Sequence, residues 1–136
     1  MGISFAITAY NEHEELKVLL NQLEQIAKPD DEIVIQLDSK ATPEVLSLVD
    51  QFITKDFDFT VKKCIFDLNN HFADFKNNLK SYCTKDWVFQ IDADETLSET
   101  FSRVIHEVLD ANDGIDLIVV PRVNIVKGLE QDDIIQ

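Results

Sequence analysis

The sequence is poor in glycine, proline, cysteine and basic residues. Three glycines and three prolines in 136 residues are too few for a linker or a low-complexity tract. Cys64 and Cys83 have neither zinc-ligand nor redox spacing, and one pair is no disulfide framework, so we expect a reducing cytoplasm. Twelve Lys and Arg against 26 Asp and Glu give a net charge of -14, which excludes a nucleic-acid partner because such binding needs a basic patch.

The sequence also lacks a long apolar run and a glycine-rich phosphate loop. Neither a signal peptide nor a membrane span is therefore predicted. No G-x-G-x-x-G or Walker A pattern follows the first apolar segment, which excludes dinucleotide-binding and P-loop proteins. With 45% hydrophobic residues, residues 1–136 are expected to form a single domain with its own core.

Strand-like and helix-like segments alternate along the chain. Short β-branched or aromatic runs predict strands, and apolar residues at helical spacing predict helices. Strands are expected at 3–8, 32–37, 59–65, 87–91 and 117–120, and helices at 12–28, 43–53, 72–82 and 97–109. This order predicts an α/β fold with a mostly parallel open sheet and helices on both faces.

Several residues are expected to shape these elements. Asn11 is a candidate N-cap with Glu14 at the capping-box position, and Thr42 with Pro43 would start the second helix. The strand at 87–91 should be mostly buried. Helical spacing places Phe72, Phe75 and Phe101 in the core rather than on a stacking surface.

Three carboxylates follow the strand at 87–91. Asp92, Asp94 and Glu95 would repel one another unless a cation, Mg²⁺ or Mn²⁺ for oxygen ligands, offsets their charge. The segments 8–12 and 38–40 also follow strands, so all three should meet at the carboxyl edge of the sheet, where α/β proteins bind ligands. The sequence therefore suggests a divalent metal holding phosphates.

At this point the chain resembles a family 2 glycosyltransferase of the GT-A type. The resemblance spans nearly the whole chain but only the donor-binding half of a typical member. Its motifs are Ile7-Thr8-Ala9-Tyr10-Asn11-Glu12, Leu37-Asp38-Ser39, Phe72-Ala73-Asp74-Phe75-Lys76-Asn77, Asp86-Trp87 with Asp92-Ala93-Asp94-Glu95, and Pro121-Arg122-Val123-Asn124. It implies a Rossmann-like three-layer sandwich, short or truncated at its C-terminal side.

The resemblance also implies a site. The nucleotide contacts carried over from the family are Thr8, Tyr10, Glu12, Asp38, Lys76 and Asp92. Asp94 is the first choice for the metal ligand and Asp92 the second, with Mn²⁺ or Mg²⁺ as the cation. Lys76 stands where relatives often carry Arg. It keeps the positive charge but lacks the planar guanidinium group, which can form two parallel hydrogen bonds. Asp38 could instead only cap a turn with Ser39.

The implied reaction is transfer of a sugar from a nucleoside-diphosphate sugar, with a UDP-sugar favoured, to an acceptor hydroxyl with inversion. The acceptor would be a saccharide or a lipid-linked group, and a carboxylate base would deprotonate it. The acids in the tail are weak candidates for that base: Glu130, Asp132 and Asp133. Two alternatives stay open, a non-catalytic nucleotide-sugar binding module and a nucleotidyltransferase, and an oligomer or a second chain could supply the acceptor half.

Overall fold

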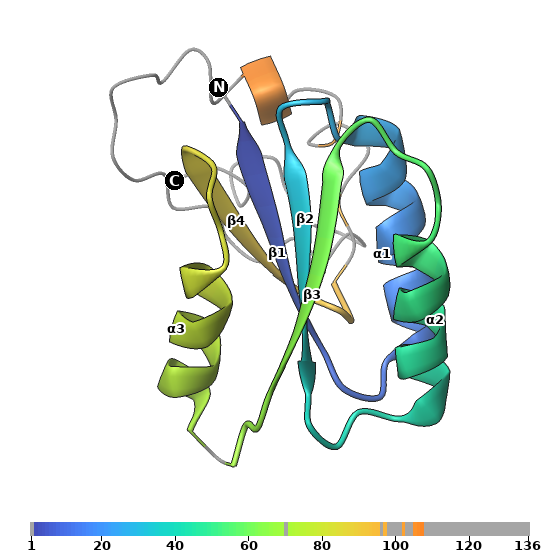
Figure 1. Ribbon diagram of the computed structural model, residues 1–136, viewed down its shortest axis with the longest axis vertical. Coiled ribbons are helices and arrows are strands. Elements are labelled where there is room, and N and C mark those ends of the chain that lie inside the picture. Colours follow the sequence, from blue (N-terminus) through green and yellow to red (C-terminus); the bar gives the residue numbers. More distant parts are fainter. Residues whose placement is uncertain (1, 70, 96, 98–101, 103–104, 108–136) are drawn as a thin grey trace, which may run out of the picture.

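Parallel strands alternate with helices in the part of the chain that the structure, a computed structural model, describes: residues 2–69, 71–95, 97, 102 and 105–107. The elements are β1 (Ile3–Ala9), α1 (His13–Ile26), β2 (Glu32–Asp38), α2 (Pro43–Ile53), β3 (Thr60–Phe66), α3 (Phe72–Ser81) and β4 (Trp87–Asp92). The strand order is β3-β2-β1-β4, and every pairing is parallel. Helices α1 and α2 cover one face of the sheet and α3 covers the other, which confirms the predicted α/β class (Figure 1).

The two faces of the sheet differ in chemistry because side chains alternate along each strand. Phe5 and Ile7 of β1 and Ile35 of β2 point toward α1 and α2, where they form the main hydrophobic core. On the α3 face the buried apolar cluster is small and consists of Ala6, Val34 and Leu79. The polar residues of the central strands therefore lie on the face that α3 covers.

Two helix starts were predicted, and one was wrong. Thr42 caps α2 as expected, because its Oγ1 accepts a hydrogen bond from Val45 N at 3.4 Å. Helix α1 begins at His13 with Glu12, not Asn11, at the N-cap position, and no side chain caps it. The Glu12 carboxylate instead accepts hydrogen bonds from the amides of the preceding turn, so the capping box does not form.

Two expectations about burial were also wrong. Phe72 is 64% exposed, because Phe75 already lies against the last residue of β3, Phe66, and Phe72 is one turn further out. In β4 only Ile91 is buried, whereas Val88 and Gln90 are exposed. The helix on their side of the sheet, α3, packs over β1, β2 and β3 rather than β4.

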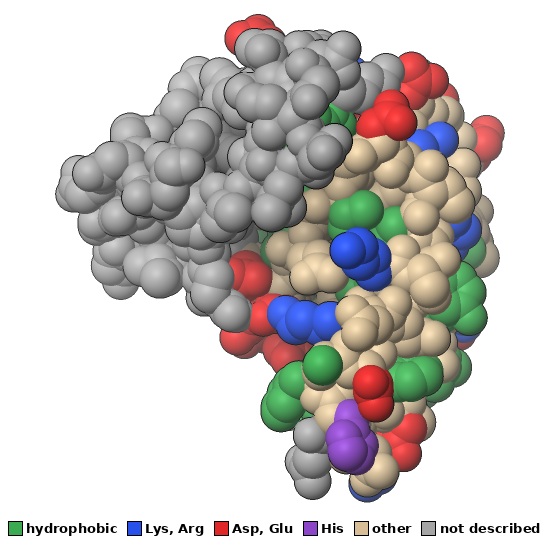
Figure 2. Space-filling view, turned by 90° about the vertical axis from the view of Figure 1, so that its left-hand side faces the viewer, with side chains coloured by type: hydrophobic (Ala, Val, Ile, Leu, Met, Phe, Trp, Pro, Cys, Tyr) green, Lys and Arg blue, Asp and Glu red, His purple; other side chains and the backbone are tan. Residues whose placement is uncertain are grey.

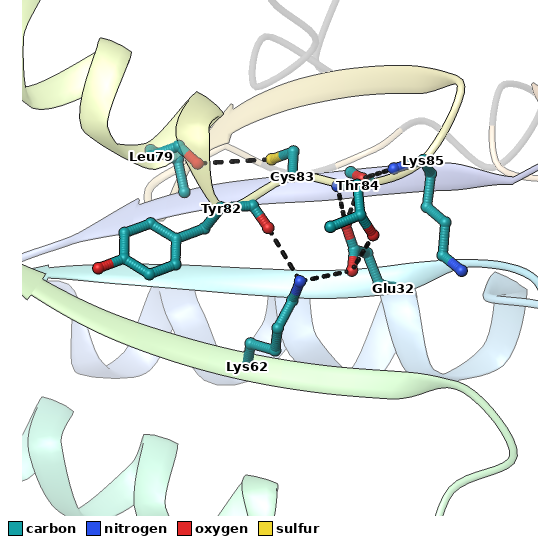
Figure 3. Close-up of polar contacts among 8 residues, drawn as sticks. Glu32, Lys62, Leu79, Tyr82, Cys83, Thr84 and Lys85 are labelled. Atoms are coloured by element: carbon teal, nitrogen blue, oxygen red, sulfur yellow. Dashed lines mark hydrogen bonds and ion pairs between the residues drawn. The ribbon is translucent and has the colours of Figure 1, made fainter.

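A buried carboxylate holds the amino edge of the sheet together (Figure 3). Glu32 accepts hydrogen bonds from Ser4 Oγ at 2.6 Å and from Thr84 N at 2.7 Å, and its Oε1 lies 2.9 Å from Lys62 Nζ. Burial pushes the pKa of Glu32 upward, but the bonds from Ser4, Thr84 and Lys62 outweigh it, so the pKa falls to about 2. The ionised form is therefore the stable one in the folded protein.

The described residues after β4 pack back toward the amino edge. Leu97 and Ile105 join the main core, and His106 Nε2 lies 2.6 Å from Asp31 Oδ2. Phe101 and the fifth strand predicted at 117–120 lie outside the described residues. Within the described residues, no helix has the length and apolarity that crossing a membrane requires.

Candidate functional site

Thr8 and Asp92 form the centre of the candidate site, at the carboxyl ends of two neighbouring strands. The pairing of β1 with β4 sets them side by side, and Thr8 Oγ1 donates a hydrogen bond of 2.9 Å to Asp92 Oδ1. Beyond them, Ala93 N donates to Thr8 O at 2.9 Å. The backbone register thus fixes one oxygen of Asp92 toward β1, as expected for residues at the same sheet edge.

The three acids at the end of β4 differ in their exposure and contacts. Glu95 is buried, and its Oε1 accepts a hydrogen bond from Asp92 N at 2.7 Å while Glu95 N donates to Asp92 O at 2.9 Å. These reciprocal bonds close the turn and remove Glu95 from the outer acid cluster. Asp94 is exposed, and among the described residues it has no hydrogen-bond or ion-pair partner. Asp92 and Asp94 are therefore the carboxylates that a ligand can reach.

Lys76 brings a positive charge to this pair of acids. Its Nζ lies 3.8 Å from Asp92 Oδ1, and the two side chains are 43% and 30% exposed. In the view that faces α3, one basic side chain lies beside acidic ones, while apolar side chains are scattered over the surface (Figure 2). At such exposure the ion pair contributes little to stability, so the ammonium is available to an anionic ligand.

The turn after β1 presents Tyr10 to solvent. The Tyr10 side chain is 45% exposed, and its carbonyl oxygen accepts a hydrogen bond from Thr42 N at 3.0 Å, which joins this turn to the start of α2. Glu12 Oε1 accepts from Tyr10 N at 2.7 Å and from Asn11 N at 3.0 Å. Glu12 therefore shapes the turn, and Tyr10 is the exposed aromatic residue of the turn.

Asp38 ends β2 with its carboxylate already engaged. Its Oδ1 accepts a hydrogen bond from Leu68 N at 2.9 Å, and its Oδ2 accepts a longer one from Lys40 N at 3.3 Å. The side chain is buried, and it ties the end of β2 to the loop that precedes α3. In that loop Asn69 takes a positive φ of 42°, which asparagine tolerates better than most residues. The turn-capping role that the sequence left open for Asp38 is thus present, together with a longer-range brace.

The predicted site residues therefore fall into two groups. Tyr10, Lys76, Asp92 and Asp94 can be reached from outside, whereas Glu12 and Asp38 hold loops and Thr8 orients Asp92. The acids named as candidate bases, Glu130, Asp132 and Asp133, lie outside the described residues. The sequence grouped Glu95 with Asp92 and Asp94 as a possible ligand-facing acid. It could not predict that Glu95 would be buried and would accept a hydrogen bond from Asp92 N instead.

Asp92 and Asp94 alone do not supply a complete coordination shell for a metal ion. Among the described residues, no group of three or more His, Cys, Asp or Glu side chains is arranged to hold a metal ion. Two carboxylates at an open strand end nevertheless match the way Mg²⁺ is commonly held, by one or two carboxylates plus substrate phosphates and water. The donor set fits a divalent cation that arrives with a phosphate ligand.

The fold and its acidic edge define a GT-A-like α/β domain, and comparison with known proteins gives the family. The family model described as glycosyl transferase family 2 matches residues 4–133, so the chain belongs to this family. No curated protein gives a significant match. Among solved structures, S. aureus TarS 1-349 matches with a TM-score of 0.67 and 19% identity over 82% of this chain. The match covers 33% of the TarS chain, so this chain spans about a third of that structure.

Proposed function

We propose that this domain binds a nucleoside-diphosphate sugar at the carboxyl edge of its sheet and serves an inverting, metal-dependent sugar transfer to an acceptor hydroxyl. The observation that carries the proposal is the cluster of Thr8, Asp92, Asp94 and Lys76, which combines two reachable carboxylates with one ammonium. Membership in glycosyl transferase family 2 supports the reaction class. A UDP-sugar is the favoured donor.

Each reachable residue has a different part in donor binding. Tyr10 offers an exposed ring on which a nucleotide base can stack. Lys76 lies close enough to Asp92 to meet a diphosphate oxygen at the same place. Thr8 donates a hydrogen bond to one oxygen of Asp92 and so helps to orient this carboxylate, which would contact the ribose or the diphosphate. Asp38 and Glu12 keep the loops around the nucleotide in shape.

The net charge of -14 disfavours a diphosphate at an acidic edge unless a cation or local hydrogen-bond donors offset the repulsion, and we propose a divalent cation in this role. Asp94 would hold Mn²⁺ or Mg²⁺ directly, because it is exposed and engaged by no other described side chain. Asp92, already bonded to Thr8, would contribute from beside it. Once bound, such an ion supplies charge neutralisation of the departing diphosphate.

Substitution of Asp94 tests the proposal. Calorimetry with UDP in the presence of Mn²⁺ should show that Asp94→Asn weakens metal-dependent binding by at least about tenfold, since it removes ligand charge at an exposed position that the fold does not need. Asp58→Asn is the matched control, because Asp58 is also exposed but lies in the turn between α2 and β3 at the opposite edge.

The outcomes separate the alternatives. Equal Mn²⁺-dependent affinity of Asp94→Asn and the parent for every nucleoside diphosphate would refute the metal assignment. Release of free UDP from a UDP-sugar in the presence of acceptor would support a transferase. Donor binding with no release under any acceptor tested would instead identify a binding module.

A further inference from the structure

A glutamine is buried in the middle of the central strand β2. Gln36 has no exposed surface, and its neighbours in the strand, Ile35 and Leu37, are part of the main core on the other face. Its side chain points toward α3. A buried amide destabilises a protein unless it is hydrogen-bonded, so the partners of Gln36 indicate what the residue does.

Gln36 holds α3 at two places. Its Nε2 donates a hydrogen bond of 2.6 Å to Phe75 O, and its Oε1 accepts one of 2.7 Å from Asn78 Nδ2. Oε1 also lies 3.5 Å from Cys64 Sγ of β3, a long contact from a thiol donor. The pair of bonds spans residues 75 to 78, so one side chain from the sheet sets the position of α3 by hydrogen bonds with defined directions.

Apolar packing is less extensive under α3 than under α1 and α2. It consists of the buried ring of Phe75 near Phe66 and of a small cluster in which Leu79 packs against Ala6 and Val34. The C-terminal end of the helix has a separate tether, because Lys62 Nζ donates to Tyr82 O at 2.9 Å. In the middle of α3, the hydrogen bonds that join the helix to the sheet among the described residues are those of Gln36.

Lys76 lies between the two held positions. Its ammonium is 3.8 Å from Asp92 Oδ1, close to the outer limit of an ion pair. A shift of α3 by one residue in register combines a rise of about 1.5 Å with a rotation of about 100°. The rotation would turn Lys76 away from Asp92. The place of the Lys76 charge therefore depends on what fixes this part of the helix.

We propose that Gln36 and Asn78 are positioning residues that hold α3 in the register that places Lys76 beside Asp92. The two hydrogen bonds to residues 75 and 78 carry this assignment. Its consequence for donor binding rests on the proposed function, because only there does the Lys76 ammonium meet a diphosphate.

The first experiment measures the position of Lys76 without any nucleotide. A water-soluble carbodiimide joins Lys76 Nζ to the Asp92 carboxylate as an amide, taking up the lost oxygen as a urea, and peptide mass spectrometry measures the yield. Gln36→Leu, which keeps the volume and removes both bonds, should lower this yield by about threefold or more. Asn78→Ala, which keeps the bond to Phe75 O, should lower it less.

Matched controls separate positioning from general loosening. Val49→Ala removes buried volume from α2 on the other side of the sheet and should leave the cross-link yield unchanged. Lys76→Arg keeps the charge but offers no amine, so the cross-link should vanish. If Gln36→Leu does not fold, Asn78→Ala decides the question alone. A parental yield in the folded Gln36→Leu or Asn78→Ala protein would overturn the assignment.

The second experiment is a double-mutant cycle on UDP affinity with Mn²⁺. Gln36→Leu should weaken binding by about threefold or more in the parent and have no effect in the Lys76→Met background, because it acts through Lys76. Equal effects in both backgrounds would show that Gln36 reaches the donor by another route and would overturn this step. A parent that binds no nucleoside diphosphate would refute the proposed function, while the cross-link yield would still decide the positioning role.

Discussion

Replacing Glu32 by glutamine should destabilise the protein by an amount that depends on pH. In the folded protein the Glu32 carboxylate accepts hydrogen bonds from Ser4 and Thr84 and pairs with Lys62, and its pKa is about 2 instead of 4.5. A difference of one unit in pKa corresponds to about 1.36 kcal/mol, so the lowered pKa of Glu32 contributes about 3 kcal/mol to the free energy of unfolding at pH 7. Glu32→Gln keeps the shape of the side chain. It removes the negative charge, however, and places an NH₂ group, itself a donor, against the donors of Ser4, Thr84 and Lys62.

The sign of the pH dependence follows from the lowered pKa. The stabilisation is complete above the unfolded-state pKa of 4.5 and is lost as the pH falls toward about 2, where the folded carboxylate takes up its proton. Of the ~3 kcal/mol at neutral pH, roughly 2 kcal/mol should be gone by pH 3. The difference in the free energy of unfolding between the parent and Glu32→Gln should therefore become smaller as the pH falls from 7 to 3.

Urea unfolding between pH 7 and pH 3 measures the gap directly. Glu24→Gln is the control: its carboxylate meets Lys55 Nζ at 3.4 Å near the surface, and its loss should cost no more than about 1 kcal/mol. A gap that stays constant from pH 7 to pH 3 would show that packing, not the ionised carboxylate, causes the loss. UDP affinity should be unchanged, because Glu32 pairs with Ser4 at the amino end of β1 whereas Asp92 pairs with Thr8 at its carboxyl end.

Two further predictions concern the carboxyl edge and α3. Asp38→Ala should cost about 1 to 3 kcal/mol in urea unfolding, because Leu68 N and Lys40 N lose their acceptor, and should weaken UDP binding both with and without Mn²⁺. Parental UDP affinity would remove Asp38 from the site. Phe75→Ala should cost about 3 to 5 kcal/mol, since its ring is buried near Phe66, whereas Phe72→Ala should change stability by less than about 0.5 kcal/mol. Similar losses for both phenylalanines would contradict the exposed position of Phe72.

Helical spacing alone could not assign Phe72 and Phe75 correctly. Both residues fit the apolar face of the same amphipathic pattern, but burial depends on where the sheet beneath the helix ends. Phe75 is buried and its ring lies near Phe66 of β3, whereas Phe72 is 64% exposed. The same limit applies to β4, whose residues look buried by composition but depend on which strands α3 covers.

The edge that carries the candidate site was easier to predict, because the topology of a parallel sheet is strongly constrained. Parallel strands joined by right-handed crossovers bring every strand end to one edge, so Thr8, Asp38 and Asp92 could be grouped from their sequence positions. The grouping could not say which side chains stay open. Glu12, Asp38 and Glu95 were all acids near strand ends, yet each accepts backbone amides instead of facing outward.

The sequence by itself determined the alternation of strands and helices, the parallel sheet and the edge where its polar residues gather, because these follow from periodicity and chain direction. Only the tertiary structure decided which polar residues stabilise loops and helices and which remain exposed to a ligand. Whether a carboxylate or an amide braces the fold or faces a ligand depends on donors far away in sequence, such as Leu68 N for Asp38 and Asn78 Nδ2 for Gln36. Residue type and spacing do not specify these long-range donor–acceptor distances, which are set only when the chain folds.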